Sequence, residues 1–77
     1  MASYDVLKDI VRSGSNLVLL QGISYDVLRE LAALAEQTGA KITVPTSMSY
    51  DLIRELSSRY GNSISFIDGL EDFKKAE

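Results

Sequence analysis

Apolar and polar residues follow one eight-residue pattern that occurs three times along the chain. The copies are 3–10 (SYDVLKDI), 24–31 (SYDVLREL) and 49–56 (SYDLIREL). The fourth, fifth and eighth residues of each copy are apolar, a spacing that places them on one face of a helix with the charged residues opposite. Self-similarity of this kind indicates a structural repeat, so the pattern predicts three amphipathic helices of the same design.

Each copy also carries the signals that begin and end a helix. Its serine suits the N-cap, and its aspartate falls in the first turn, where negative charge is favoured by the helix dipole. The basic residue three positions after the aspartate is expected to pair with it. A glycine follows each copy and is expected to end the helix in a left-handed conformation. These predicted residues are Ser3, Asp5, Lys8 and Gly14; Ser24, Asp26, Arg29 and Gly39; and Ser49, Asp51, Arg54 and Gly61.

Alternating apolar residues after each glycine predict strands over 16–21, 41–45 and 63–68. One face of these strands is uniformly apolar and carries Leu17 and Leu19, Ile42 and Val44, and Ile64 and Phe66. Helices alternating with strands indicate parallel pairing through right-handed crossovers. The predicted fold is therefore α/β: a three-fold helix–strand repeat (αβαβαβ) with a small three-stranded parallel sheet.

The pattern is compatible with two strand orders. In a solenoid-like 1-2-3 order all helices lie on one face, and the polar residues Lys41, Thr43, Ser63 and Ser65 face water. In a 2-1-3 order the first strand is central. Two features favour 2-1-3: the strand 16–21 is apolar on both faces, as a central parallel strand should be, and Pro45 suits an edge strand.

The chain contains no linker, so we expect one domain over 1–77. Its units are approximately 3–23, 24–48 and 49–70, and 71–77 form an acidic C-terminal cap in which a fourth helix is expected to begin at Glu71.

Composition narrows the chemistry available to this fold. The 77 residues include no Cys, His or Trp, so thiol nucleophiles, disulfides and histidine general bases are excluded. The net charge of −3 argues against nucleic-acid binding, and the lack of a long apolar run or an N-terminal signal predicts a cytoplasmic protein that has no membrane contact. A chain of this length buries only about 60% of its unfolded surface and is stabilised by association.

The repeated side chains predict architecture more than catalysis. Asp5, Asp26 and Asp51 are three copies of one helix start, whereas catalytic carboxylates need different environments. The chain lacks phosphate-binding glycine motifs. We therefore expect no enzyme activity, no catalytic residues, no metal site and no cofactor.

Ligands of α/β proteins usually bind where parallel strands end, at the carboxyl edge of the sheet. The residues predicted near that edge, and so the candidates for binding a small ligand, are Gln21, Gly22, Tyr25, Thr46, Ser47, Tyr50, Asp68 and Gly69. Ligand binding is the alternative function.

Protein contact is the function that the sequence favours, through homo-oligomerisation or docking on a partner protein. A short parallel sheet has two open edges, and a repeat with matching ends can join head to tail. The 1-2-3 order would expose Val18, Leu20, Pro45 and Ile67, and the 2-1-3 order would expose a helix rich in small residues at Ala32 and Ala33.

Two segments, 11–22 (VRSGSNLVLLQG) and 63–73 (SISFIDGLEDF), resemble the small α/β subunits of the sulfur-relay DsrE/DsrH-like family. That resemblance implies an oligomeric subunit that passes persulfide sulfur. Because sulfur relay requires a cysteine and this chain has none, the resemblance implies a non-catalytic scaffold subunit.

Overall fold

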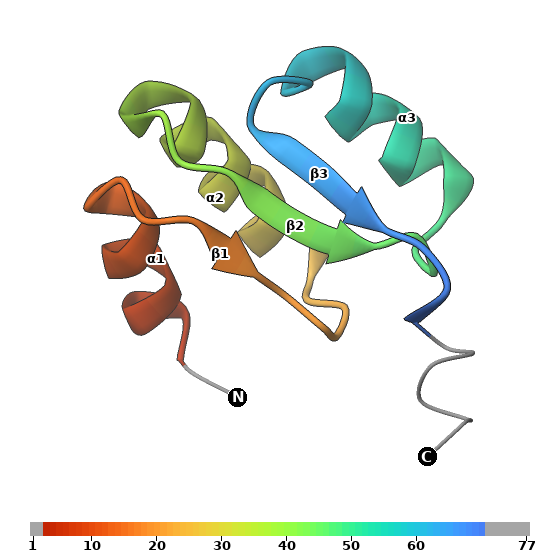
Figure 1. The fold of residues 1–77 in the computed structure, drawn as a ribbon, viewed down its shortest axis with the longest axis horizontal. Coiled ribbons are helices and arrows are strands. Elements are labelled where there is room, and N and C mark those ends of the chain that lie inside the picture. The colour runs from red at the N-terminus through yellow and green to blue at the C-terminus, as the bar shows by residue number, and fades with distance from the viewer. Residues whose placement is uncertain (1–2, 71–77) are drawn as a thin grey trace.

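Helices and strands alternate along the chain, as the repeat predicts. The computed structural model describes residues 3–70 (Figure 1). In chain order the elements are α1 (Tyr4–Arg12), β1 (Leu17–Val18), α2 (Tyr25–Thr38), β2 (Ile42–Pro45), α3 (Tyr50–Arg59) and β3 (Ile64–Ile67). The fourth helix expected from Glu71 lies outside the described residues.

Two of the three predicted serine caps form as expected. The Ser24 hydroxyl accepts a hydrogen bond from the Val27 amide at 3.4 Å, and Ser49 accepts one from Leu52 at 3.3 Å. The backbone of Ser3 is extended in the same way, but its side chain makes no cap hydrogen bond. The repeat therefore sets the helix starts, while the side-chain cap is present in only two copies.

The predicted glycine stops differ among the copies. Gly39 ends α2 in the left-handed conformation with φ 81°. Gly61 does not end α3 in this way, because Tyr60 is the C-cap of α3 and the φ of Gly61 is not positive. A Cβ at Gly61 would lie 2.8 Å from the carbonyl oxygen of Ser57, so this position requires glycine for close backbone approach.

The strand order is 1-2-3, so the expected 2-1-3 order is wrong. All pairs are parallel, and the register aligns Leu17 with Ile42 and Ile42 with Ile64. Phe66 aligns with Val44 in the same ladder. The predicted matching of inward-facing residues between strands is therefore confirmed.

Backbone pairing explains why Pro45, which suits an edge strand, misled the prediction of the strand order. The β1–β2 ladder is short and extends only to the bond from the Leu19 amide to the Thr43 carbonyl at 2.8 Å. Thr43 and Pro45 are on the side of β2 that faces β1, since Ile42 and Thr46 donate to β3. The N–H that Pro45 lacks would have pointed toward β1 at a place where the β1–β2 ladder has already ended, so no ladder bond is lost. The central strand therefore tolerates Pro45.

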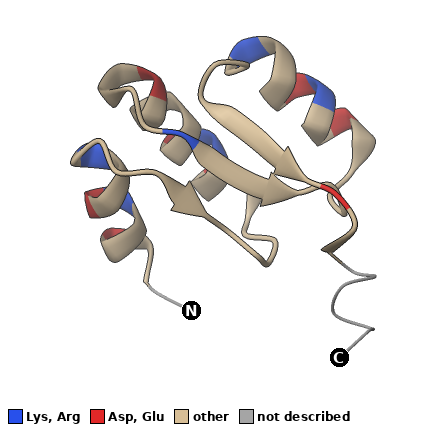
Figure 2. Cartoon of the chain, viewed as in Figure 1, with Lys and Arg blue, Asp and Glu red and all other residues tan. Residues whose placement is uncertain are grey.

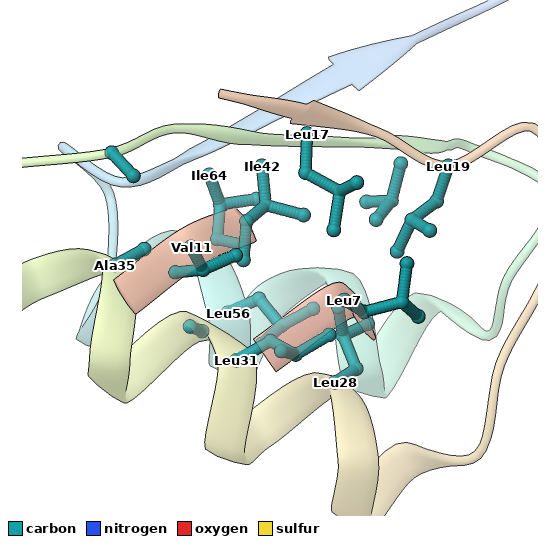
Figure 3. Packing of buried hydrophobic residues seen from close by; sticks show 13 residues of the cluster. Leu7, Val11, Leu17, Leu19, Leu28, Leu31, Ala35, Ile42, Leu56 and Ile64 are labelled. Carbon is teal, nitrogen blue, oxygen red and sulfur yellow. The ribbon is translucent and has the colours of Figure 1, made fainter. Parts of the chain in front are cut away.

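The core lies between the sheet and a single layer of helices. Figure 3 shows Leu7, Val11, Leu28, Leu31 and Leu56 on the helices pointing toward strand residues such as Ile42. The fully buried larger side chains are Leu28, Leu31, Ile42, Leu56, Val11 and Val44. This arrangement buries most of the apolar residues of the helices, and the helices of residues 3–70 leave the other face of the sheet uncovered.

The uncovered sheet face is apolar at one side and more polar toward its centre. Val18 is 59% exposed and Leu20 51%, whereas Thr43 and Ser65 are half-buried. Ser63, expected to face water in this order, is instead 5% exposed. Its amide and carbonyl are paired with Tyr60 and Ile42, respectively, which holds it against the sheet.

Charged side chains lie mainly on the three helices (Figure 2). None of the helices in the described part of the chain is long and apolar enough to cross a membrane.

Candidate protein-interaction site

A tyrosine and a basic residue one turn later form a stacked pair in every copy of the repeat. Lys8 lies 5.4 Å from the ring centre of Tyr4, and the Arg29 guanidinium 4.2 Å from that of Tyr25. In the third copy, Arg54 lies 5.7 Å from the Tyr50 ring. The sequence contained this signal as a Tyr-x-x-x-Lys/Arg spacing, which analysis of the aspartates alone missed.

The expected aspartate–basic pairs three residues apart do not form. The ion pairs within residues 3–70 are Arg12–Asp9 at 3.4 Å and Arg29–Glu55 at 3.1 Å. The basic side chain of each copy turns toward the ring of its own tyrosine, where a cation–π contact replaces the predicted charge pair.

Adjacent helices are joined through the same carboxylate position of the repeat, although its partner on the preceding helix differs between the two contacts. On the α1–α2 side, the Tyr4 hydroxyl donates to Glu30. On the α2–α3 side, Arg29 contacts both the Tyr25 hydroxyl and the Glu55 carboxylate. Glu30 and Glu55 are both the seventh residue of their copies, so each helix offers this carboxylate to the helix before it. We call these two carboxylate contacts, Tyr4–Glu30 and Arg29–Glu55, the inter-repeat latch.

The contact with Glu30 also changes the pKa of Tyr4. The hydrogen bond to Glu30 raises the pKa of Tyr4 above its ordinary value of 10.0, and partial desolvation and the negative charges of Glu30 and Asp5 act in the same direction. The protonated phenol is thus the form that the α1–α2 contact favours.

Within residues 3–70, α1 and α3 each have a neighbouring helix on one flank only. At the α1 end, Val6 is 48% exposed and Ile10 only partly buried. The equivalents of Ile10 in the later copies, Leu31 and Leu56, are both 0% exposed. At the α3 end, Tyr50 is 71% exposed, although its equivalents in the first two copies are half-buried.

A groove follows the outer side of β1. Its volume is about 360 Å³, and its lining consists of Leu7 and Ile10 from α1 and the segment 17–21. Because Leu17 and Leu19 point their backbone groups at β2, the N–H and C=O of Val18 point away from the sheet. An apolar groove and free backbone groups therefore occur together at this edge.

The predicted interface residues are only partly available. Val18 and Leu20 are exposed, and Ile67 is half-buried. Pro45 is buried, so it does not belong to an exposed patch. Ala32 is 0% exposed and Ala33 half-buried, because α2 packs between the sheet and its neighbouring helices. The helix surface expected for the 2-1-3 order is therefore not presented.

The predicted ligand residues separate into several places. Thr46, Ser47, Asp68 and Gly69 line one small hollow of about 190 Å³, where the Thr46 hydroxyl donates to Asp68 at 2.6 Å. The other candidates do not join them. Gln21 lines the groove beside β1, Gly22 follows it in a loop, Tyr25 lines a hollow with Asp51 and Glu55, and Tyr50 lies on the outer flank of α3.

The described residues contain no group of three acidic, histidine or cysteine side chains placed to hold a metal ion. Asp5, Asp26 and Asp51 are exposed and lie on separate helices. Comparison of the chain with protein-family models, curated proteins and solved structures finds no match, so none supports the sulfur-relay resemblance.

Proposed function

We propose that this chain is a non-enzymatic interaction module that acts by associating with other copies of itself or with a partner protein. The observation that carries the proposal is the bare face of the parallel sheet. Parallel sheets almost always have both faces covered, yet the helices in the described part of the chain cover one face only.

The exposed side chains of that face fit a contact surface. Val18 and Leu20 are large, apolar and more than half exposed, and they stand beside the unpaired edge of β1. A chain of 77 residues has a small core, so burial of this surface would add stability that the core alone supplies sparingly. A cysteine-free module needs no oxidising compartment, and we propose that it acts in the cytoplasm.

The native mass of the purified protein tests this proposal. Light scattering across the micromolar range should give a mass above that of one 8.5 kDa chain that rises with concentration. Lysine at both Val18 and Leu20 should lower the mass, and the control Gln37→Lys, on the exposed side of α2, should not. A stable monomer at every concentration that also captures no partner would overturn the proposal.

Small-ligand binding is the second candidate, and the hollow that joins Thr46, Ser47, Asp68 and Gly69 is the observation in its favour. It ranks second because about 190 Å³ is smaller than the usual ligand pocket of about 300–1,000 Å³. A thermal-shift screen against metabolites and nucleotides tests it, since a ligand at 100 times its Kd adds about 2.7 kcal/mol. A shift that disappears in Asp68→Asn would support a site here, and no shift across the panel would remove its support.

A further inference from the structure

We infer that the partner is a second copy of this chain, docked head to tail so that its α1 and β1 lie against α3 and β3 of the first copy. The inference rests on the proposed function of association and adds the mode. In this mode the contact between copies repeats the contact between successive repeats within one chain.

The α1 end has the apolar surface that the mode requires. Within the chain, Leu31 and Leu56 occupy the eighth position of their copies and are completely buried, with a preceding helix present on their flank. Ile10 occupies the same position in α1, the first helix of the described residues, and is only partly buried. Val6 lies one turn before Ile10 on the same flank and is 48% exposed. Ile10 and Val6 therefore form an apolar surface of the kind that a neighbouring helix covers in the later copies.

The α3 end has the complementary surface. In the first two copies the tyrosine flank of the helix faces the next helix, as the Tyr4–Glu30 contact shows. In α3 the same flank carries Tyr50, 71% exposed, and Arg54, also exposed. A broad open hollow of about 580 Å³ lies beside it and is lined in part by Ile53, Arg54 and Ser57. The flank thus has room for a docked helix.

The charges on the two ends are complementary. Asp9 is the seventh residue of the first copy and so corresponds to the latch carboxylates Glu30 and Glu55. Arg54 corresponds to Arg29, which contacts Glu55 at 3.1 Å. Head-to-tail docking therefore places Asp9 of the second copy opposite Arg54 of the first. Asp9 now pairs with the exposed Arg12 at 3.4 Å, and such exposed pairs contribute about 0–1 kcal/mol, so the exchange costs little.

The sheet edges continue the same relation. Leu17 aligns with Ile42 and Ile42 with Ile64, so one further step of the register aligns Ile64 with Leu17 of the second copy. In β3 the carbonyls of Ser63 and Ile67 face β2, which leaves the backbone groups of Phe66 pointing to the open edge. A parallel ladder between β3 and the second β1 would pair these groups and lengthen the sheet.

Head-to-tail contacts use two different surfaces, so assembly does not stop at a dimer. The copies continue into a filament, or into a ring if the rotation between copies closes. This property separates the inference from face-to-face pairing of two bare sheets, in which the same surface of both copies is used.

Charge reversal at each end, followed by mixing, tests the mode. In Asp9→Arg two arginines oppose each other across every contact, and in Arg54→Asp two aspartates do. We expect each variant alone to lose at least tenfold in association affinity by sedimentation velocity. An equal mixture of the two should recover wild-type association, because every contact then joins an arginine to an aspartate. The matched control is Arg59→Asp, on the same helix but away from the open flank, which should associate like wild type.

Each outcome decides the inference. Circular dichroism of every variant checks the fold, and the milder pair Asp9→Asn and Arg54→Gln replaces any variant that does not fold, with a smaller loss expected for each. The head-to-tail mode would be overturned if both charge reversals associated as strongly as the wild type, or if the mixture of the two variants did not regain wild-type association. Either result would leave association itself standing. A wild-type chain that stays monomeric would overturn the mode, and capture of a different protein partner by that monomer would leave the proposed function standing.

Discussion

Replacing Leu31 with alanine should separate the buried core of this fold from its open end. Leu31 is 0% exposed and is the eighth residue of the second repeat copy. Ile10 is its equivalent in the first copy and is only partly buried. Leu31→Ala and Ile10→Ala therefore make the same kind of truncation at one repeat position, inside and at the end of the array.

The two truncations should differ severalfold in cost. Leu31→Ala removes completely buried methyl groups and leaves a cavity among α1, α2 and the sheet, which costs about 2–5 kcal/mol. At about 0.05–0.15 kcal/mol per residue, a chain of 77 residues has about 4–12 kcal/mol in all, so this variant loses a large part of its stability. Ile10→Ala should cost about 1 kcal/mol in the monomer, because water already reaches that side chain.

Urea unfolding followed by far-ultraviolet circular dichroism, at concentrations low enough to favour the monomer, gives both free energies. If the unfolding free energy falls with urea concentration at the same slope in the wild type and both variants, the shifts in the unfolding midpoint report changes in stability. Equal losses for the two variants would refute the assignment of Leu31 to the interior and Ile10 to an open end. Repeating the measurement at high concentration adds a second test, since docking on Ile10 should increase the cost of its truncation.

Three smaller perturbations test the local structure. Ser24→Ala should cost about 1 kcal/mol through its cap, whereas Ser3→Ala should cost less because Ser3 makes no such bond; the same urea titration compares them, and equal costs would contradict the cap assignment. Gly39→Ala should lower the melting temperature because φ is 81° there, while Gly22→Ala, with open space around it, should not, and equal melting temperatures would count against strain at Gly39. The pKa of Tyr4 is raised in the folded state, so the stabilisation that the protonated Tyr4 hydroxyl gives to the fold is complete below pH 10 and is lost as pH rises through the folded pKa. In thermal unfolding from pH 8 to 11.5, Tyr4→Phe should not show that loss. A variant with the same pH profile as the wild type would show that another group titrates.

The candidate site could be predicted from the sequence only in part. Val18 and Leu20 were expected to be exposed only in the 1-2-3 order, which is the order that the structure has. Pro45 was expected in the same patch, but it is buried in the structure. The predicted ligand residues follow three different strands, but β1 ends early and its loop diverges, so only the loops after β2 and β3 meet.

The contacts of the inter-repeat latch could likewise be predicted from the sequence only in part. Each tyrosine, basic residue and carboxylate of the repeat is visible in the sequence at a fixed spacing. Their pairing is not, because Lys8, Arg29 and Arg54 each have an aspartate three residues before them and a tyrosine four residues before them. In the structure all three basic side chains lie over their own tyrosine, Arg54 at the open end included, and Arg29 also reaches Glu55 on α3.

The sequence by itself determined the helices, the strands and the register of their apolar faces. These features depend on local spacing, capping and alternation, which the first copy carries less completely: Ser3 makes no cap hydrogen bond, and β1 spans Leu17–Val18 of the predicted 16–21. The strand order was decided only by the tertiary structure, because the inward apolar face of each strand suits both orders, which differ in where each crossover returns to the sheet and in whether Val18 and Leu20 are covered. That choice left one sheet face and two unlike ends open, and it is on these surfaces that the proposed association depends.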